Sequence, residues 1–349
     1  MANKFRYPTG VRPLLVDEAR RRRWMESRFV EMLSEAGFDE VLLPIIDYVE
    51  PYAPVVSREA TRQSYRFVDR EGELVAIRSD FTPMIARALG PTLSAADLPL
   101  RVFYRGDVIR CEATRLGVNR EMFQIGAEII GDDSIAADVR TLTLAASCLG
   151  GFGIRPLVTY TDVSIAAAIL GSASSDEERA AIRAALVSKR TTGLAGATPL
   201  ARTLAAGTAT LDDIAAWEPT SAAARRLRAI AAAVEDVAGA DFVLQLDDVE
   251  ASAGYYTGLR FRMYGGPARA RLAQGGRYDT LYAQFGEGTP AIGFTFTVDD
   301  VTDAAPESGS PIRRGRLSEP ATPIRNAENP PSVPPPDDRE TAPETGRSA

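Results

Sequence analysis

The sequence predicts an α+β fold in which helices flank an antiparallel sheet. Some segments place apolar residues three and four positions apart, as helices do, whereas others alternate and are joined by polar, glycine-bearing segments, as antiparallel strands are. The composition also changes along the chain. We therefore expect an α+β region over 1–162 and 239–302, a helical insertion over 163–238, and a disordered tail over 303–349.

The composition excludes several classes of function. The 349 residues are 45% hydrophobic and 25% charged, which is enough to bury one large core or two modest ones. A net charge of −7 argues against a general affinity for nucleic acid. The chain contains no histidine, so histidine-based acid/base catalysis and histidine metal ligands are both excluded.

The two cysteines and the lengths of the apolar runs bear on the cellular compartment in which the protein is expected. Cys111 and Cys148 have no metal-binding spacing and suit a reducing environment. The N-terminal residues lack the apolar core of a signal peptide, and no apolar run reaches the roughly 18 residues that a membrane span needs. We expect a cytoplasmic protein that uses no metal ion, no cofactor and no membrane.

The helices and strands of the first half are predicted from the spacing of apolar residues and from two residues that end elements, Gly37 and Pro44. Gly37 stands where a left-handed residue ends the first helix. Pro44 has no N–H to donate, which places the first strand at a sheet edge or a subunit boundary. The expected helices are 17–36, 82–89 and 134–149, and the expected strands are 40–43, a hairpin over 65–77, the antiparallel pair 100–112 and 120–130, and 157–161.

The second half begins with the helical insertion, where Ala, Leu and Arg dominate and β-branched runs are few. Strands are expected again at 242–247, 255–264 and 291–298, and the glycine-bearing segment 274–279 separates the last two. Ten of the 23 prolines follow Asp303, with no Phe, Trp or Tyr. This composition predicts disorder, and a non-functional extension is favoured over a partner-binding arm.

Polar side chains recur on one face of each long central strand. Because side chains alternate along a strand, Arg110 and Glu112 share a face of the first strand, and Gln124 and Glu128 share a face of the second. A solvated sheet face would explain this stripe. A ligand floor would explain it equally well, with Arg110 binding a carboxylate and Glu128 an ammonium group. Spacing alone leaves both interpretations open.

Two more pairs carry alternative interpretations. Asp80 and Thr82 suit the start of the following helix, and capping is the favoured explanation for both. Tyr255 and Tyr256 are neighbours in a predicted strand. One of them would therefore line a pocket while the other packs in the core.

Four segments, in this order, resemble the catalytic domain of class II aminoacyl-tRNA synthetases, and specifically the histidine-tRNA ligase group. The resemblance spans 7–300 without the helical insertion. The segments are 38–44, similar to the dimer-forming motif 1; 101–131, similar to motif 2 with Arg110-Cys111-Glu112 in place of Arg-His-Glu; 274–279, similar to the signature Ala-Gly-Gly-Arg-Tyr-Asp; and 289–294, similar to the opening of motif 3.

The resemblance implies a histidine-binding pocket. Its acids and tyrosines would face the ammonium and imidazole groups of the ligand. Asp80 stands where the ligases have Glu, so the negative charge is kept. The ligand-binding residues implied are Asp80, Thr82, Arg110, Gln124, Glu128, Tyr255, Tyr256 and Tyr278.

The activation chemistry of the ligases is not matched. The arginine that ends motif 3 and binds the ATP phosphates corresponds to Asp300, and the arginine at the reacting carboxylate corresponds to Ala251. The aromatic residue that stacks on adenine is replaced by Met122, and the second arginine of that loop by Val118. One misplaced electrostatic donor costs on the order of 10²–10³ in rate, so we expect no catalytic residue and no adenylate formation.

A histidine-ligase-like chain without this chemistry resembles the regulatory subunits of ATP phosphoribosyltransferase, which short-form catalytic subunits require for the first step of histidine biosynthesis. The resemblance implies a non-catalytic homodimer within a hetero-oligomer, where it helps the catalytic subunit respond to histidine. We expect no anticodon-binding domain and no tRNA partner. The alternatives are a pseudo-enzyme that acts as a binding module for another partner and, least favoured, an active histidine-tRNA ligase.

Overall fold

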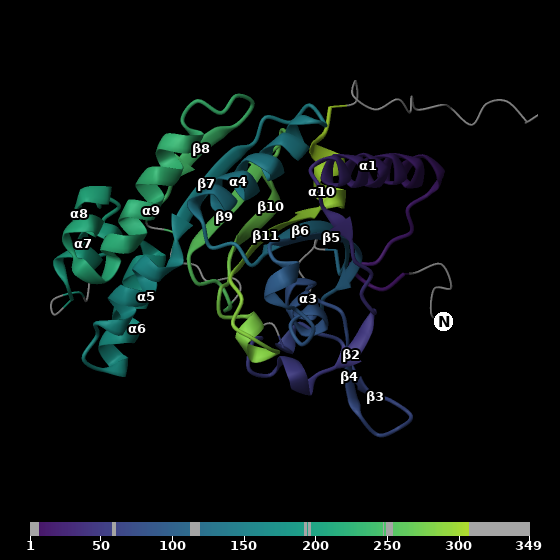
Figure 1. The fold of residues 1–349 in the computed structure, drawn as a ribbon, viewed down its shortest axis with the longest axis horizontal. Coiled ribbons are helices and arrows are strands. Elements are labelled where there is room, and N and C mark those ends of the chain that lie inside the picture. The colour runs from purple at the N-terminus through teal and green to yellow at the C-terminus, as the bar shows by residue number, and fades with distance from the viewer. Residues whose placement is uncertain are drawn as a thin grey trace, which may run out of the picture. The chain divides into compact units, whose positions relative to one another are not determined.

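A large mixed sheet organises the chain (Figure 1). The structure is a computed structural model that describes residues 7–57, 61–111, 119–191, 194, 197–246, 248 and 254–306. Within these residues, eight strands pair in the order β1-β5-β6-β11-β10-β9-β7-β8. Their bounds are β1 Asp39–Glu40, β5 Leu100–Ile109, β6 Glu121–Ile130, β7 Leu157–Asp162, β8 Asp241–Leu244, β9 Leu259–Gly265, β10 Ala270–Arg277 and β11 Ala291–Thr297.

The antiparallel sheet predicted from the sequence is confirmed for the six strands from β5 to β7 in that order. The two outermost pairs, β1 with β5 and β7 with β8, are parallel. As predicted from Pro44, β1 lies at a sheet edge. It is shorter than the predicted strand, because pairing with β5 covers only Asp39 and Glu40.

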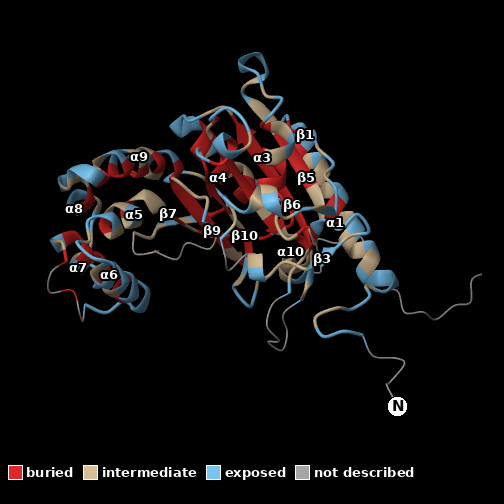
Figure 2. Cartoon of the chain, turned by 90° about the horizontal axis from the view of Figure 1, so that it is seen from below, coloured by how far each residue is buried: buried red, intermediate tan, exposed pale blue. Residues whose placement is uncertain are grey.

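One face of the sheet is covered by α1 (Val16–Glu35), α4 (Ile135–Gly150) and α10 (Val298–Ala304). Phe29 of α1 lies at the centre of this core, with ring centroids 4.6 Å from Phe152 and 4.7 Å from Phe296. Gly37 has a φ of +83°, so the predicted left-handed end of α1 is confirmed. Figure 2 shows burial concentrated in the strands of this sheet.

The opposite face carries α3 (Thr82–Leu89). Ile85 of this helix and Phe81, which precedes it, pack with Tyr104 of β5 in a second core. A smaller antiparallel sheet precedes α3 in the chain and has the order β2-β4-β3. Its strands are β2 Ile46–Tyr48, β3 Arg66–Val68 and β4 Leu74–Ile77. The predicted hairpin is therefore confirmed, with Gly72 at its turn and a φ of +90°.

The segment predicted as a helical insertion is helical where it is described, with bounds α5 Val163–Gly171, α6 Asp176–Ser188, α7 Pro199–Ala205, α8 Leu211–Ala216 and α9 Glu218–Val234. Ser175, Thr198 and Thr210 each accept a backbone hydrogen bond as the N-cap of one of these helices. The longest helix, α9, contacts α4, β7 and β8. None of the described helices is long and apolar enough to cross a membrane.

Two strand predictions were wrong. The predicted strand 255–264 begins only at Leu259, and the glycine-bearing segment 274–279 contributes most of its length to β10, which the sequence did not predict. Gly275 lies so close to Gly293 and Phe261 that any side chain there would overlap them. Glycine is therefore required here by close packing inside a paired strand, whereas the sequence analysis treated the segment only as a separator between two strands. The predicted tail lies outside the described residues from 307 onward.

Candidate functional site

A small hollow on the α3 face of the sheet brings together residues that are far apart in the sequence. The predicted residues that line it are Asp80, Thr82, Arg110, Gln124, Tyr255, Tyr256 and Tyr278. They come from α3, the ends of β5 and β10, the middle of β6, and the segment that precedes β9. The solvated-face interpretation of the polar stripe is therefore wrong for Gln124 and Glu128, since their exposed fractions are 5% and 1%.

Glu128 lies beneath the hollow rather than in its lining, with its carboxyl oxygens bonded to two lining residues. Thr82 Oγ1 donates to Oε1 at 3.1 Å, and the Tyr278 hydroxyl donates to Oε2. Burial raises the pKa of the Glu128 carboxyl well above its usual range, and the nearby charge of Asp80 adds to this effect. The site therefore holds a carboxyl group that would gain stability from an incoming cation.

The position of Glu128 depends on strand register. β6 and β11 pair so that Glu128 stands opposite Gly293. A Cβ atom at position 293 would overlap Glu128 Oε2. Glycine is the one residue type without a Cβ, so only glycine leaves room for this carboxyl group.

Asp80 bonds both to the backbone at the start of α3 and to a tyrosine of the hollow. Its Oδ1 accepts from the Thr82 amide at 3.1 Å, which satisfies a free N–H at the start of α3. Its Oδ2 accepts from the Tyr255 hydroxyl at 3.0 Å inside the hollow. Thr82 itself does not cap α3 through its side chain, because its hydroxyl donates to Glu128.

Both Tyr255 and Tyr256 line the hollow, whereas alternation along a strand would have allowed only one of them to do so. Both precede β9, so the alternation of a strand does not apply to them, and both line the hollow. The Tyr255 ring centroid lies 5.2 Å from that of Tyr256 and 5.8 Å from that of Tyr278. Burial raises the pKa of the Tyr255 hydroxyl well above its usual range, and Asp80 raises it further, so this hydroxyl acts as a hydrogen-bond donor.

Arg110 supplies a positive charge on the rim. It follows β5, and its Nε donates to the Ser79 carbonyl at 3.1 Å, next to Asp80. The guanidinium group is thus fixed beside the acids of the hollow, where it suits a carboxylate. Glu112, its predicted partner in the polar stripe, lies outside the described residues.

The hollow is small in this structure. Its volume is about 20 Å³, which is room for roughly one water molecule. A ligand as large as an amino acid therefore requires lining side chains to move apart. The strands beneath the lining are paired on both sides, so a ligand would displace lining side chains and not the strands.

Sequence reasoning missed five residues that complete the lining: Gln274, Gly275, Gly293, Phe294 and Thr295. They belong to β10 and β11, and Gln274 pairs with Thr295. In the observed register Gln274 shares a sheet face with Gln124 and Glu128, with β11 between them. The glycines of this segment obscured that pattern.

The positions predicted to lack activation chemistry are partly described. Asp300 lies in α10 and stands outside the lining of the hollow. Its burial, together with the neighbouring Asp299 and Asp303, raises the pKa of the Asp300 carboxyl to about 6. Ala251 and Val118 lie outside the described residues.

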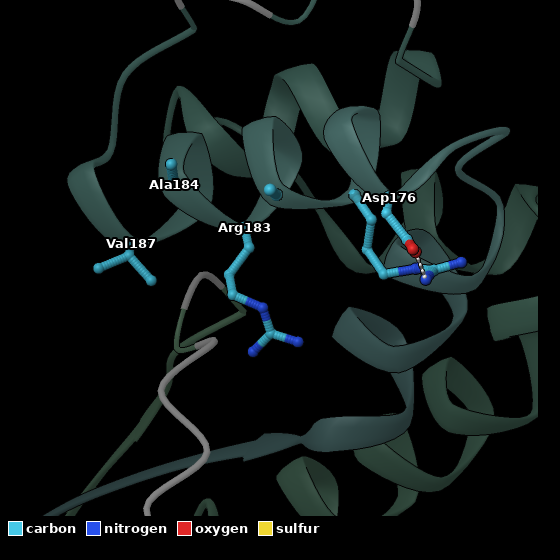
Figure 3. Close-up of a pocket in the computed structure, with 6 residues that line it drawn as sticks. Asp176, Arg183, Ala184 and Val187 are labelled. Carbon is cyan, nitrogen blue, oxygen red and sulfur yellow. Dashed lines mark hydrogen bonds and ion pairs between the residues drawn. The ribbon is translucent and has the colours of Figure 1, made fainter.

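A second hollow lies on the exposed side of α6 (Figure 3). It has a volume of about 460 Å³ and is lined by Asp176, Arg179, Ala180, Arg183, Ala184 and Val187. Asp176 and Arg179 pair with each other at 2.6 Å. This hollow contains none of the predicted site residues. Among the described residues, no group of three Cys, Asp or Glu side chains is placed to hold a metal ion.

The raised pKa of Glu128 makes a prediction about stability. A carboxyl whose folded-state pKa is raised contributes most to stability below its usual pKa of about 4.5, and this contribution is lost as the pH rises through the folded value. Glu128→Gln should therefore raise the unfolding temperature of the ligand-free protein at about pH 8. The gain should shrink as the pH approaches 4.5.

Thermal unfolding across this pH range measures the effect. Glu121→Gln, at the exposed start of the same strand, is the control and should follow the parent protein at every pH. A Glu128→Gln variant whose difference from the parent does not change with pH would contradict the assignment.

Comparisons with known proteins agree with this architecture. The family profile described as "Histidyl-tRNA synthetase" matches residues 10–301. A solved structure titled as an ATP phosphoribosyltransferase regulatory subunit/histidyl-tRNA synthetase from Bacillus halodurans has a TM-score of 0.74 at 24% identity, covering 88% of this chain and 84% of that one. A histidine-tRNA ligase subunit from Alicyclobacillus acidocaldarius has a TM-score of 0.72 at 28% identity, covering 87% and 98%.

Curated relatives carry a more specific name. One from Anaeromyxobacter dehalogenans, named "ATP phosphoribosyltransferase regulatory subunit", is 32% identical over 85% of this chain and 90% of its own length. Another of the same name, from Paramagnetospirillum magneticum, is 33% identical over 87% of this chain and 83% of its own length. The chain therefore belongs to the ATP phosphoribosyltransferase regulatory subunit family, which has a histidyl-tRNA synthetase-like fold.

Proposed function

We propose that this chain is the non-catalytic regulatory subunit of a short-form ATP phosphoribosyltransferase and that its hollow binds histidine. The observation that carries the proposal is the charge pattern of the site, with Arg110 on the rim, Asp80 in the lining and the Glu128 carboxyl group beneath it. An amino acid carries the complementary pattern of one carboxylate and one ammonium group. The membership of the family supports the role in histidine biosynthesis.

The chemistry of the lining favours a ligand with a second polar group that both donates and accepts hydrogen bonds. Glu128 and Tyr278 form a donor–acceptor pair deep in the site. An imidazolium placed there would pair with the Glu128 carboxylate and reverse the effect of its burial. A neutral imidazole would exchange hydrogen bonds with the same two groups.

The absence of catalysis is supported by Asp300. Adenylate formation concentrates negative charge on phosphate oxygens, which cationic groups stabilise. An acid at the position where the ligases have an arginine acts in the opposite direction. Burial raises the pKa of Asp300 to about 6, so this acid still carries negative charge at neutral pH.

The regulatory role predicts a result in a reconstituted system. Mixed with the short-form catalytic subunit of the same host, the chain should co-purify with it and raise its phosphoribosyltransferase activity above that of the catalytic subunit alone. The chain alone should show no ATP–pyrophosphate exchange with histidine. Exchange at a rate typical of a ligase would restore the synthetase assignment, and failure to co-purify under conditions that preserve complexes would exclude the proposed partner.

The proposed ligand predicts a binding result. Calorimetric titration with histidine should show binding to the parent chain, and both Arg110→Ala and Glu128→Ala should weaken it by about 10- to 100-fold, because each removes a charged hydrogen-bond partner. Arg105→Ala is the matched control, since Arg105 lies on β5 and pairs with Glu40 outside the hollow. Equal affinities for all four proteins would contradict the pocket.

We also propose that the chain is a homodimer within this complex. Large apolar side chains are exposed on β2, β3, β4 and the segment that leads to β2, namely Leu42, Ile45, Ile46, Tyr48, Phe67, Val68 and Leu74. The pairing of β2 and β3 with β4 puts Ile46, Tyr48 and Phe67 on one face. An apolar surface of this kind next to a sheet edge is typical of a subunit interface.

If the chain is a homodimer through this apolar surface, a charged side chain placed there should lower the mass of the particle in solution. Ile46→Asp, at a side chain that is 50% exposed, should leave the fold intact but convert the dimer to a monomer, since it places a carboxylate in the apolar contact. Sedimentation velocity measures the change. Val187→Asp, at an exposed position on α6, is the control and should remain dimeric. A monomeric parent chain would rule the interface out.

A further inference from the structure

The described residues contain a second fully buried carboxyl group, and its partners come from two distant parts of the chain. Asp138, in the first turns of α4, has an exposed fraction of 0%. One of its oxygens accepts from Arg277 of β10 and the other accepts from Arg226 of α9. A single carboxylate therefore connects the helical insertion to the strand that ends at the hollow.

All three nitrogens of the Arg277 guanidinium group donate hydrogen bonds. Its Nε and Nη2 donate to Asp138 Oδ1 at 3.0 and 2.7 Å, and its Nη1 donates to the Asp132 carbonyl and to Asp279 Oδ1, both at 3.0 Å. With 2% of its surface exposed, this guanidinium has little freedom to rotate. Its position is set by Asp138 and by the residues that begin α4.

Arg226, on α9 of the helical insertion, bonds to residues at the start of α4. Arg226 Nε donates to Asp138 Oδ2, and its Nη2 donates to the Asp133 carbonyl at 2.8 Å and the Ser134 carbonyl at 3.2 Å. This one side chain satisfies three acceptors around the start of α4. Among the described residues, these bonds are polar contacts that hold α9 against the start of α4.

From Arg277 the bonds continue to the hollow. The next residue, Tyr278, donates its hydroxyl to Glu128, and its amide donates to the Ala291 carbonyl at 2.8 Å. Asp279 Oδ1, which receives Arg277, also receives the Ala291 amide at 3.1 Å. The orientation of Arg277 is thus tied to the backbone that carries Tyr278.

The buried position makes these bonds strong and mutually dependent. A buried carboxylate is costly unless several donors satisfy it, and bonds within a desolvated network reinforce one another. If α9 moves away from α4, Asp138 loses one of its two guanidinium partners. Its charge is then balanced by Arg277 alone, which changes the strength of the bonds that hold Arg277.

We propose that Asp138 is a positioning residue that couples the docking of α9 to the geometry of the hollow, so that the insertion sets the affinity for the ligand. The effect of α9 on ligand affinity rests on the proposed histidine site. The effect of α9 on the geometry of the hollow does not. The insertion is thereby a place where a bound partner subunit would influence the ligand, and the ligand the partner, by equal factors.

The test compares Arg226→Met with Arg225→Met. Arg225 is the exposed neighbour of Arg226 on α9, and its side chain bonds only to Ser221 among the described residues. Methionine keeps the aliphatic packing of either arginine, and Arg226→Met leaves Asp138 paired with Arg277, so both variants should fold. Hydrogen exchange of the Tyr278 and Ala291 amides and calorimetric titration with histidine are the two measurements.

In Arg226→Met we expect both amides to exchange about fivefold faster or more, and the histidine dissociation constant to rise by about fivefold or more, the lower end of ordinary coupling. Arg225→Met should match the parent in both. Arg226→Lys restores a cation beside Asp138 and should recover part of the loss.

Unchanged exchange at Tyr278 and Ala291 in Arg226→Met would overturn the proposal whatever the titration shows. Faster exchange with unchanged histidine affinity would overturn the coupling to the ligand. If the parent chain itself does not bind histidine, the proposed ligand fails, and the exchange comparison still decides whether α9 positions the hollow.

Discussion

The site depends on a carboxyl group that the fold buries without a cationic partner among the described residues. Glu128 is held by hydroxyl donors from Thr82 and Tyr278, over a strand position where only glycine leaves space. Hydroxyl groups satisfy the oxygens of a carboxyl but do not offset the loss of hydration of its charge, which is why burial raises its pKa. A cation placed beside this carboxyl group would therefore offset part of the cost of its burial.

Asp138 is also a buried carboxyl group, but unlike Glu128 its charge is balanced by arginine side chains. It is as deeply buried as Glu128, yet guanidinium groups occupy both of its oxygens. One carboxylate is thus neutralised inside the protein and joins three elements, whereas the other is held by hydroxyl groups alone among the described residues. Arg277 links them, since it bonds to the first and precedes Tyr278, which bonds to the second.

Much of the fold was predictable because it is encoded locally. The helical spacing that ends at Gly37, the hairpin turn at Gly72 and the pair of long central strands each depend on residues close in sequence. The segment that became β10 was not predictable in this way. Gly275 is required by the approach of a neighbouring strand and an aromatic ring, and sequence spacing contains no information about either.

The sequence by itself determined which chemical groups this protein contains: acids and tyrosines at positions that resemble an amino-acid pocket, an aspartate where the ligases have a phosphate-binding arginine, and no histidine. Only the tertiary structure decided how these groups meet. It placed Glu128 below the lining, turned both Tyr255 and Tyr256 inward, and joined Asp138 to residues 88 and 139 positions away. The physical reason is that the identity of a group is local, whereas its burial and its partners depend on how distant strands align and how helices pack across them.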